Sequence, residues 1–493
     1  MPEKYESTRN PQVQADARQA VLKGIAPDGG LYVLKDLADR QVDLDQVLKN
    51  SYKENAAYIL GLLFDDYTAA ELQTAAANAY TGTFDDEKVV PVKKAGGIHV
   101  LELFHGPTSA FKDVALTMLP QLMSTALKDT DEKALILTAT SGDTGKAALS
   151  GFKDVDNTGI VVFYPDGKVS DVQYRQMATQ PGANVKVYGV RGNFDDAQTA
   201  VKKLFLSDEL EKAAAGHNVR LSSANSINIG RLAPQVVYYF DAYKQLVNDG
   251  TIEKGDKVSF SVPTGNFGDV LAGFYAYKMG LPVDKFIVAS NANNVLTEFL
   301  TTGTYDRNRD FIKTISPSMD ILVSSNLERF LYYMSGNDHK RVAEWMNDLA
   351  RNGKYTVDDD VLSAIQELFL CDYADDEATK ETIKEVYEKA GYVLDPHSAI
   401  GYRAAETAKA NGVKTPIIAL ATASPYKFAQ DVLSAIDNEE REPWQALHDL
   451  EKINADGMPE PLKVVEKADI RHKDIIEVKD MEQAVRKAWE ECL

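Results

Sequence analysis

Short, wholly apolar segments, each followed by a turn and a helical pattern, restrict the fold of this 493-residue chain more than any other feature. A continuous apolar run of four to eight residues is the form of a parallel strand covered on both faces. The runs alternate with amphipathic segments of about 12 to 15 residues, which predicts α/β architecture with parallel sheets. Ligands in such folds bind beyond the carboxyl ends of the strands. The runs are residues 134–139, 159–164, 185–190, 259–262, 286–290 and 417–421.

The chain divides by pattern into three parts. A tight turn at residues 27–30 leads into a short strand, and apolar residues then recur at helical spacing from Val42 to Ala79. We expect an amino-terminal domain at 1–95, a smaller α/β domain at 96–225 and a larger one at 226–493. Residues 340–390 and 428 to the end are typical of charged amphipathic helices. Carboxylate clusters at 358–360 and 375–377 are expected to be solvated helix starts.

The charge balance limits the partners. The chain has 54 Lys plus Arg against 74 Asp plus Glu, a net charge of −20. This argues against nucleic acid or an anionic membrane as partner, and an anionic ligand would need local cations and N–H groups. The longest apolar run, residues 56–64, is far shorter than the roughly 20 residues of a membrane span. The polar first residues predict no signal peptide. Cys371 and Cys492 lack metal-type spacing, so we expect inert thiols, no metal site and a cytoplasmic protein.

One lysine stands at a position that suits chemistry. The stretch LELFHGPTSAFKDVALTMLPQ, from Leu101, reads as strand, turn and helix, with Lys112 at the helix start. The first-turn N–H groups carry partial positive charge, and we expect the amine to be partly buried behind Phe111. Both effects should lower the amine's pKa and make it a better nucleophile toward a carbonyl. Taken alone, the stretch favours a solvated surface lysine, because lysines are mostly exposed.

A glycine turn follows the strand at residues 259–262. In TGNFGD, the segment Gly265, Asn266, Phe267, Gly268 and Asp269 can turn several backbone N–H groups inward at a helix start. The glycines let the backbone approach a phosphate closely. A plain connection between strand and helix is the alternative.

A second turn, TSGDTGK, follows the strand at residues 134–139. Its hydroxyls suit a carboxylate or a phosphate. Its final Gly145-Lys146 invites comparison with a nucleotide-binding P-loop. However, Thr140 stands where that loop needs its first glycine, and Ala147 stands where Ser or Thr would bind magnesium. The pattern therefore disfavours a nucleotide.

Two further clusters lie near expected strand ends. The segment NSINIGRLAPQ carries Asn225, Ser226, Asn228 and Arg231, and the arginine could clamp a phosphate in bidentate fashion. Capping a helix or pairing with a carboxylate is the alternative role of this arginine. In TASPYKF, Thr422 follows a buried strand, where a hydroxyl can meet a ring nitrogen.

The motifs HGPTSAFKD, SGDTG, NSINIGR, PTGNFGD and TASPYKF, in this order, resemble the long type of the threonine synthase family, within the fold type II pyridoxal-phosphate enzymes. The match begins at YESTRN and DGGLYV. It implies two parallel-sheet α/β domains and an amino-terminal helical domain. The implied cofactor is pyridoxal 5'-phosphate, and the implied reaction converts O-phospho-L-homoserine and water to L-threonine and phosphate. Two residues depart from the pattern: Ser424 replaces an expected histidine, and Leu34 follows DGGLYV where proline is expected. Asp143 stands where related enzymes often have asparagine, a feature similar to the long threonine synthases.

The resemblance also implies residue roles. Lys112 would join the cofactor's aldehyde, Thr422 would contact its ring nitrogen, and Asp143 would lie near its ring hydroxyl. The cofactor phosphate would rest on Gly265, Asn266, Phe267, Gly268 and Asp269. The substrate's carboxylate and phosphate would be bound by Thr140, Ser141, Gly142, Thr144, Ser226, Asn228 and Arg231.

Several alternatives stay open. His105 could meet the substrate phosphate, and for both His105 and His397 a structural role satisfied by a backbone partner is as well supported. Another fold type II lyase or dehydratase, a nucleotide-binding protein and an inactive scaffold are the competing functions. We expect a small-molecule substrate and a monomer or homodimer.

Overall fold

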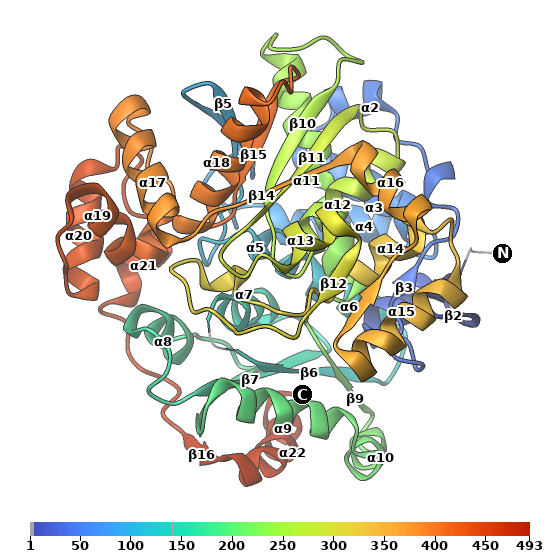
Figure 1. The fold of residues 1–493 in the computed structure, drawn as a ribbon. Coiled ribbons are helices and arrows are strands. Elements are labelled where there is room, and N and C mark those ends of the chain that lie inside the picture. Colours follow the sequence, from blue (N-terminus) through green and yellow to red (C-terminus); the bar gives the residue numbers. More distant parts are fainter. Residues whose placement is uncertain (1–3, 141) are drawn as a thin grey trace.

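Two parallel sheets form the upper and lower parts of the molecule in Figure 1, and the amino-terminal elements lie beside them. The computed structural model describes residues 4–140 and 142–493. All six predicted strands are present. Among the described residues, no helix is both long and apolar enough to cross a lipid bilayer.

The larger sheet has six strands in the order β14-β11-β10-β15-β5-β4, all parallel except the edge strand β4. Alternate residues of its strands face opposite layers. Ile418 and Leu420 join the core that includes helices α11 and α12, whereas Ile417 and Ala419 join the core that includes α17–α19. The strands are β4 (Val92–Ala95), β5 (Ile98–Glu102), β10 (Val258–Pro263), β11 (Val283–Ser290), β14 (Phe369–Tyr373) and β15 (Ile417–Ala421); the helices are α11 (Ile229–Asn248), α12 (Gly268–Lys278), α17 (Asp376–Ala390), α18 (Pro396–Ala410) and α19 (Ala429–Asp437).

The smaller sheet has five parallel strands in the order β16-β8-β7-β6-β9. Ile136 and Val162 face the layer of α6 and α7, and Leu137 and Phe163 face α9, α10 and α22. The strands are β6 (Lys133–Ala139), β7 (Thr158–Pro165), β8 (Val185–Arg191), β9 (Val219–Ser222) and β16 (Ile475–Glu477); the helices are α5 (Lys112–Leu116), α6 (Met118–Leu127), α7 (Asp143–Phe152), α8 (Asp171–Ala178), α9 (Phe194–Phe205), α10 (Asp208–Gly216) and α22 (Met481–Cys492).

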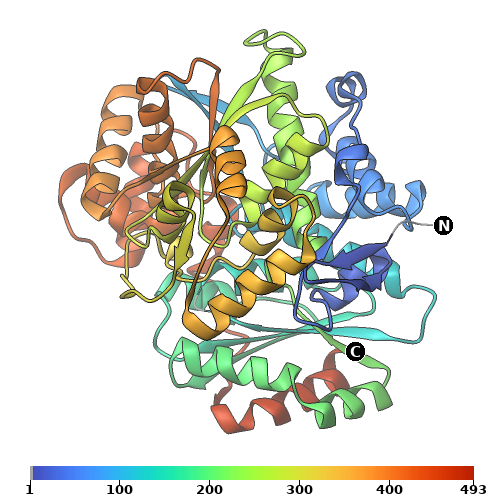
Figure 2. The ribbon, with the colours of Figure 1, turned by 45° about the vertical axis from the view of Figure 1, so that its right-hand side comes forward.

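The amino-terminal segment combines helices with a small antiparallel sheet of order β2-β1-β3. The expected short strand is β3, and the helical pattern from Val42 to Ala79 forms α2, α3 and α4. Helix α3 packs on α11, and Figures 1 and 2 both show these elements against the larger sheet's helices. The elements are β1 (Tyr5–Ser7), β2 (Asn10–Ala15), β3 (Tyr32–Val33), α1 (Ala17–Lys23), α2 (Leu44–Lys49), α3 (Tyr52–Leu63) and α4 (Ala69–Tyr80).

Three strands lie where the sequence predicts only charged helices, so that expectation is wrong at these places. The short strand β13 (Lys354–Thr356) pairs with β12 (Thr304–Asp306) outside the two large sheets. The segment FLCDY forms β14 at the edge of the larger sheet, and β16 pairs with β8 of the smaller one. Both are short edge strands, whose exposed side carries polar residues and hides the strand pattern. The carboxylate clusters do begin helices: Asp358 precedes α16 and Asp375 caps α17. The remaining helices and strands are α13 (Val295–Thr302), α14 (Leu327–Met334), α15 (His339–Asn352), α16 (Asp359–Leu368), α20 (Pro443–Ile453), α21 (Glu460–Val465), β12 (Thr304–Asp306) and β13 (Lys354–Thr356).

The sheets do not follow the predicted division of the chain. Strands β4 and β5, before residue 103, pair within the larger sheet, and β16, near the carboxyl end, pairs within the smaller one. Figure 1 shows the red carboxyl-terminal chain running from α21 down to α22. Each sheet is therefore built from segments far apart in the sequence.

Candidate active site

The turn that carries Lys112 lies against the segment after β15. Leu103 N–H donates to Ala421 O at 3.0 Å, Phe111 N–H to Thr422 O at 2.8 Å, and Ser424 N–H to Ser109 O at 3.0 Å. Asp113 closes the turn, because its carboxylate accepts from the N–H and hydroxyl of Thr108 at 2.8 and 2.5 Å. Lys112 is thereby fixed at the carboxyl ends of β5 and β15, where ligands of parallel sheets bind.

Lys112 has the lowered pKa that the sequence predicts, although the main cause is burial. Burial, together with the positive charges of Arg231 and Lys427, outweighs the attraction of Asp143 and lowers the pKa of Lys112 to about 8. Helix α5 has only five residues, so the positive electrostatic field at its start is small. Among the described residues, the amine has one hydrogen bond, to Ser318 Oγ at 3.5 Å. The amine is thus free for a ligand.

Thr422 contacts the residue that precedes this lysine, because its carbonyl accepts from Phe111 N–H. Its N–H donates to Ser398 Oγ at 3.1 Å, and Ser398 in turn donates to Asp395 Oδ2 at 2.6 Å. The residue is buried, and its hydroxyl has no hydrogen bond within the described part of the chain. The backbone of Thr422 is anchored while its hydroxyl remains available.

The turn GNFGD presents unpaired backbone donors at the start of α12. Phe267 adopts a left-handed conformation, with φ of 60°, and its ring packs against Phe330 with centroids 5.1 Å apart. In the structure as described, the N–H groups of residues 265–268 have no protein acceptor. A Cβ at Gly265 would lie 3.1 Å from Ser318 O and 3.2 Å from Met319 Cα, so the backbones approach too closely for a side chain. Such a turn can receive an anion.

An amide missed by the sequence analysis adds a donor to this turn. Asn326 Oδ1 accepts from Arg329 Nη1 at 2.6 Å, which orients the side chain. Its Nδ2 is buried, has no hydrogen-bond partner within residues 4–140 and 142–493, and lies 3.5 Å from the position of a Cβ on Gly268. A buried orphan donor beside free N–H groups fits the phosphate of pyridoxal phosphate. No periodicity or spacing in the sequence singles out this asparagine.

Asp269 is the acidic member of the turn, and its carboxylate faces α11. Tyr238 Oη and Tyr239 Oη donate to its Oδ1 at 2.5 and 2.9 Å, while Oδ2 is buried and has no partner in the structure as described. Burial outweighs these hydrogen bonds and raises its pKa to about 6. The carboxyl group therefore anchors the turn and places little charge beside it at low pH.

The TSGDTGK turn is organised by its own first hydroxyl. Thr140 Oγ1 accepts from Gly142 N–H at 3.0 Å and Gly145 N–H at 3.1 Å, so this predicted substrate-binding residue is occupied within the turn. Gly142 and Thr144 are partly exposed and remain accessible. Ser141 lies outside the described residues.

Asp143 forms a buried ion pair that the sequence analysis did not anticipate. Its Oδ1 lies 2.7 Å from Lys427 Nζ, and the side chains are only 4% and 2% exposed. Burial opposes ionisation of Asp143, but Lys427 and then Lys112 outweigh it and lower its pKa to about 2. Lys427 also donates to Thr108 O at 2.9 Å. Its place in TASPYKF, a lysine within a largely buried segment, is the signal that could have found it.

Arg231 is a buried cation without a counterion among the residues that the structure describes. It lies in the first turn of α11, is 5% exposed, and donates from Nη1 to Ala224 O at 2.8 Å. Its Nε is buried and has no hydrogen-bond partner in the described part of the chain, and burial lowers the pKa of Arg231 to about 10. No carboxylate pairs with it among the residues described here. A buried guanidinium with no paired carboxylate is stabilised by an anionic ligand that balances its charge.

The neighbouring predicted residues differ in their availability. Asn228 caps α11 by accepting from Gly230 N–H at 2.9 Å, and its Nδ2 donates to Val21 O at 2.9 Å and Ser223 O at 3.2 Å. Both ends of this amide are therefore occupied by the protein. Ser226 is partly exposed, near Gly268.

The two histidines have protein partners. His105 contacts Asp85 Oδ1 at 2.6 Å and Glu102 Oε2 at 2.9 Å; burial opposes its charge, but these hydrogen bonds raise its pKa to about 9. Both ring nitrogens face carboxylates, which leaves none for a phosphate.

His397 orders the loop that touches Lys112. Its Nε2 accepts from Ser318 N–H at 3.1 Å, so its Nδ1 carries the proton and donates to Asp395 Oδ1 at 2.9 Å. This is the backbone partner that the sequence analysis considered.

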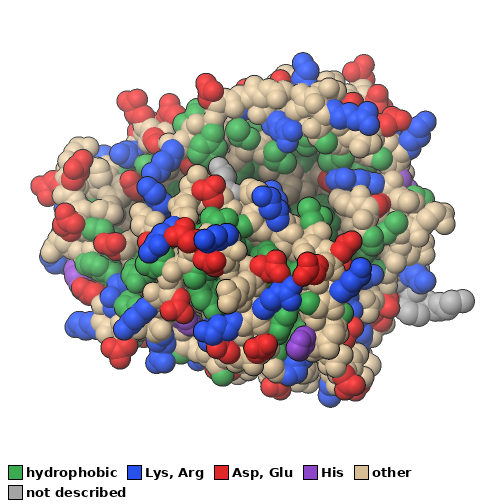
Figure 3. All heavy atoms as spheres, turned by 90° about the horizontal axis from the view of Figure 1, so that it is seen from below, with side chains coloured by type: hydrophobic (Ala, Val, Ile, Leu, Met, Phe, Trp, Pro, Cys, Tyr) green, Lys and Arg blue, Asp and Glu red, His purple; other side chains and the backbone are tan. Residues whose placement is uncertain are grey.

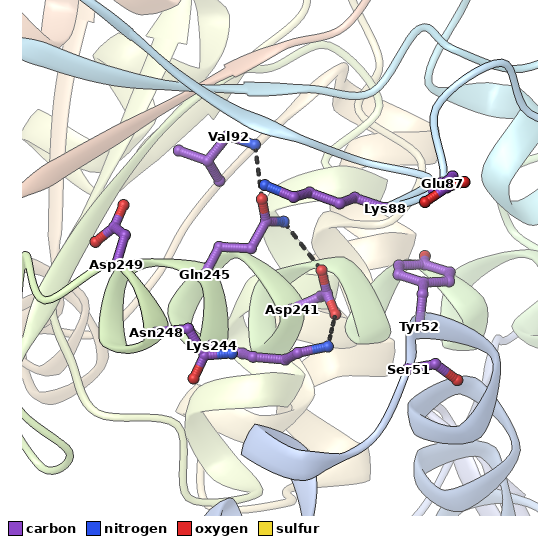
Figure 4. Close-up of a pocket in the computed structure, with 10 residues that line it drawn as sticks. All are labelled: Ser51, Tyr52, Glu87, Lys88, Val92, Asp241, Lys244, Gln245, Asn248 and Asp249. Carbon is purple, nitrogen blue, oxygen red and sulfur yellow. Dashed lines mark hydrogen bonds and ion pairs between the residues drawn. The ribbon is translucent and has the colours of Figure 1, made fainter.

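A separate cavity of about 370 Å³ lies between the start of α3, residues 87–92 and the end of α11 (Figure 4). At its floor, the Asp241 carboxylate accepts from Lys244 at 3.2 Å and Gln245 at 3.0 Å. None of the predicted site residues lines it. The proposed chemistry therefore belongs to the strand ends, not to this cavity.

Comparisons with known proteins agree with this geometry. Three family models match: "Threonine synthase N terminus" at residues 4–80, "Pyridoxal-phosphate dependent enzyme" at 90–360 and "Threonine synthase, C-terminal" at 398–476. The chain is 37% identical to a threonine synthase of Saccharomyces cerevisiae, over 94% of this chain and 96% of that protein. It is 40% identical to a threonine synthase of Pseudomonas aeruginosa, over 88% and 90%. A crystal structure of pyridoxal-phosphate-bound threonine synthase from Brucella melitensis has a TM-score of 0.86 at 38% identity, covering 98% of this chain and 99% of that one.

Proposed function

The chain belongs to the threonine synthase family, and we propose that it converts O-phospho-L-homoserine and water to L-threonine and phosphate. Its cofactor is pyridoxal 5'-phosphate. The observation that carries the substrate assignment is Arg231, a buried guanidinium without a carboxylate partner in the described structure. A phosphorylated substrate supplies the missing charge.

Five parts of the chain would hold the cofactor. Lys112 would join its aldehyde, the free N–H groups of residues 265–268 and Asn326 Nδ2 would bind its phosphate, and the Thr422 hydroxyl would accept or donate at its ring nitrogen. Asp143, neutralised by Lys427, would lie near the ring hydroxyl. When bound, pyridoxal phosphate supplies an electron sink for negative charge that develops on the attached substrate.

Lys112 is the proposed proton carrier of the reaction. With a pKa of about 8, its amine is partly neutral near neutral pH and can accept a proton on Nζ and return it. Ser318 Oγ, 3.5 Å away, can steady the amine once it is released from the cofactor. The Ser318 N–H is in turn fixed by His397.

Arg231 is proposed to bind the phosphate that leaves, assisted by Ser226. Two parallel N–H donors match phosphate geometry, and the interaction strengthens as negative charge accumulates on the leaving group. The partly exposed Thr144 and Gly142 are proposed to bind the substrate carboxylate at the start of α7, with Ser141 as a further predicted member. Thr140 and Asn228 are proposed to act by shaping the turn and capping α11.

Further properties are part of the same proposal. We place the enzyme in the cytoplasm as a monomer or homodimer. The competing function is another fold type II lyase or dehydratase that acts on an amino acid or a phosphorylated amino alcohol. Arg231 favours the phosphorylated substrate, because a neutral side chain would leave this cation buried and unpaired.

The test measures colour and product together. Purified wild type should absorb at roughly 410–420 nm, as lysine-bound pyridoxal phosphate does, and should release phosphate from O-phospho-L-homoserine. Lys112→Ala should lose both signals. Release of ammonia from threonine without phosphate release would favour the dehydratase, and absorbance that survives in Lys112→Ala would exclude Lys112 as the attachment point.

A further inference from the structure

The ion pair between Asp143 and Lys427 joins three segments around the cofactor lysine. Asp143 begins α7, Lys427 belongs to the short 3-10 helix η3 (Pro425–Phe428), and Thr108 precedes Lys112 in its turn. The ammonium of Lys427 lies 2.7 Å from Asp143 Oδ1 and 2.9 Å from Thr108 O. With 2% and 4% exposure, neither charge is solvated by water to any extent.

We propose that Lys427 is a positioning residue that keeps the Lys112 amine unpaired by occupying the Asp143 carboxylate. This inference rests on the proposed role of Lys112 as the cofactor lysine. Asp143 attracts Lys112 electrostatically, and in the described structure no carboxylate forms an ion pair with that lysine. Lys427 pairs with the carboxylate that attracts Lys112 most strongly, so the Lys112 amine can meet an aldehyde instead.

The physical reason is the cost of a buried, unpaired carboxylate. Removing one partner of a buried ion pair leaves the other charge uncompensated, and it then takes the next available cation or becomes protonated. For Asp143, the next cation is Lys112, which is the second positive group acting on it after Lys427. Without Lys427, the carboxylate should hold the lysine in its charged form.

The surrounding charges set the direction of the effect. Lys112 faces Asp143 of α7, Arg231 of α11, Lys427 of η3 and Asp113 of α5. Loss of Lys427 removes a positive neighbour and frees a negative one, and both changes favour the protonated amine. Loss of the Asp143 charge has the opposite effect. The two substitutions should therefore compensate each other when combined.

The experiment follows the protonation of Lys112 by acylation. Full-length protein, freed of cofactor, is treated briefly with acetic anhydride across a range of pH, and mass spectrometry reads the labelling of the Lys112 peptide. The set comprises wild type, Lys427→Met, Lys427→Arg, Asp143→Asn and the double variant Asp143→Asn with Lys427→Met. Lys168→Met, at an exposed position after β7, is the matched control for loss of a lysine.

Lys427→Met should move the labelling midpoint upward by about one pH unit, which is tenfold in the ratio of neutral to charged amine. Asp143→Asn should move it downward, the double variant should return toward wild type, and Lys427→Arg and Lys168→Met should leave it in place. An unmoved midpoint in Lys427→Met overturns the inference, and so does an equal shift in Lys427→Arg. If Lys427→Met does not fold, Asp143→Asn decides, because an unmoved or raised midpoint there also overturns it. Failure of the proposed function would instead appear as cofactor absorbance that persists in Lys112→Ala.

Discussion

Replacement of Lys112 by methionine should stabilise the cofactor-free protein, although it should abolish the reaction. The pKa of Lys112 falls from its ordinary 10.5 to about 8 in the folded chain, with burial as the first cause. A buried amine that is forced to carry charge disfavours the folded state, whereas methionine has similar length and no charge. Active sites often hold such locally unfavourable groups.

The magnitude follows from the pKa shift. A fall from 10.5 to about 8 corresponds to about 3 kcal/mol of unfavourable free energy while the amine is charged in both states. Because the side chain keeps partial solvent exposure, screening reduces this to about 1–2 kcal/mol. The penalty is complete below pH 8. It fades between about pH 8 and 10.5, because there the unfolded chain still binds the proton that the folded chain has lost.

Thermal unfolding of the cofactor-free proteins at several pH values checks this. For a chain of this length, about 1–2 kcal/mol should raise the midpoint of Lys112→Met by roughly 1–2 °C at pH 7. The gain should shrink as the pH rises through 8 toward 10. Lys168→Met, which changes an exposed lysine, should stay within about 0.5 kcal/mol of wild type at each pH. A loss of stability at pH 7, or a gain that does not depend on pH, would refute the reasoning.

Two substitutions probe the anion sites. Arg231→Met should raise the KM for O-phospho-L-homoserine by roughly 10- to 100-fold, because it removes charged hydrogen bonds worth about 1.5–3 kcal/mol. The cofactor absorbance should remain. Steady-state kinetics measure the KM, and an unchanged value contradicts the assignment of Arg231. Gly265→Ala should weaken cofactor affinity about tenfold, because its methyl group would lie 3.1 Å from Ser318 O and force the loop apart at a cost of about 1–3 kcal/mol. Absorbance titration measures that affinity, and a value equal to wild type would show that the loop yields freely.

The strands and the glycine turns could be predicted because their signals are local. A buried parallel strand such as Ile417–Ala421 is apolar at every position, since helices cover both of its faces. Strand β14 could not be predicted, for the opposite reason. Its burial falls along the strand from Phe369 to the exposed Tyr373, so its pattern resembles the end of an amphipathic helix. Only its pairing with β11 distinguishes the two.

The contacts across the site could not be read from the sequence. Lys427 lies in a motif that was recognised for Thr422, yet nothing in the spacing shows that its ammonium meets Asp143 of α7. Asn326 can offer a donor to the glycine turn only because Arg329 orients its side chain beside Gly268. Such partners depend on tertiary packing between segments that are distant in the chain.

The distribution of buried charge explains how a protein of net charge −20 can bind phosphate groups. Over the face shown in Figure 3, acidic and basic side chains are interspersed, and their fields are screened within about 8–10 Å by salt. Inside the site, each carboxylate is committed to a protein partner: Asp143 to Lys427, Asp269 to two tyrosines and Asp395 to Ser398 and His397. Arg231 remains without a carboxylate among the described residues. It follows that reversing surface charges should change phosphate affinity little, whereas removing the buried cation, as in Arg231→Met, should weaken it strongly.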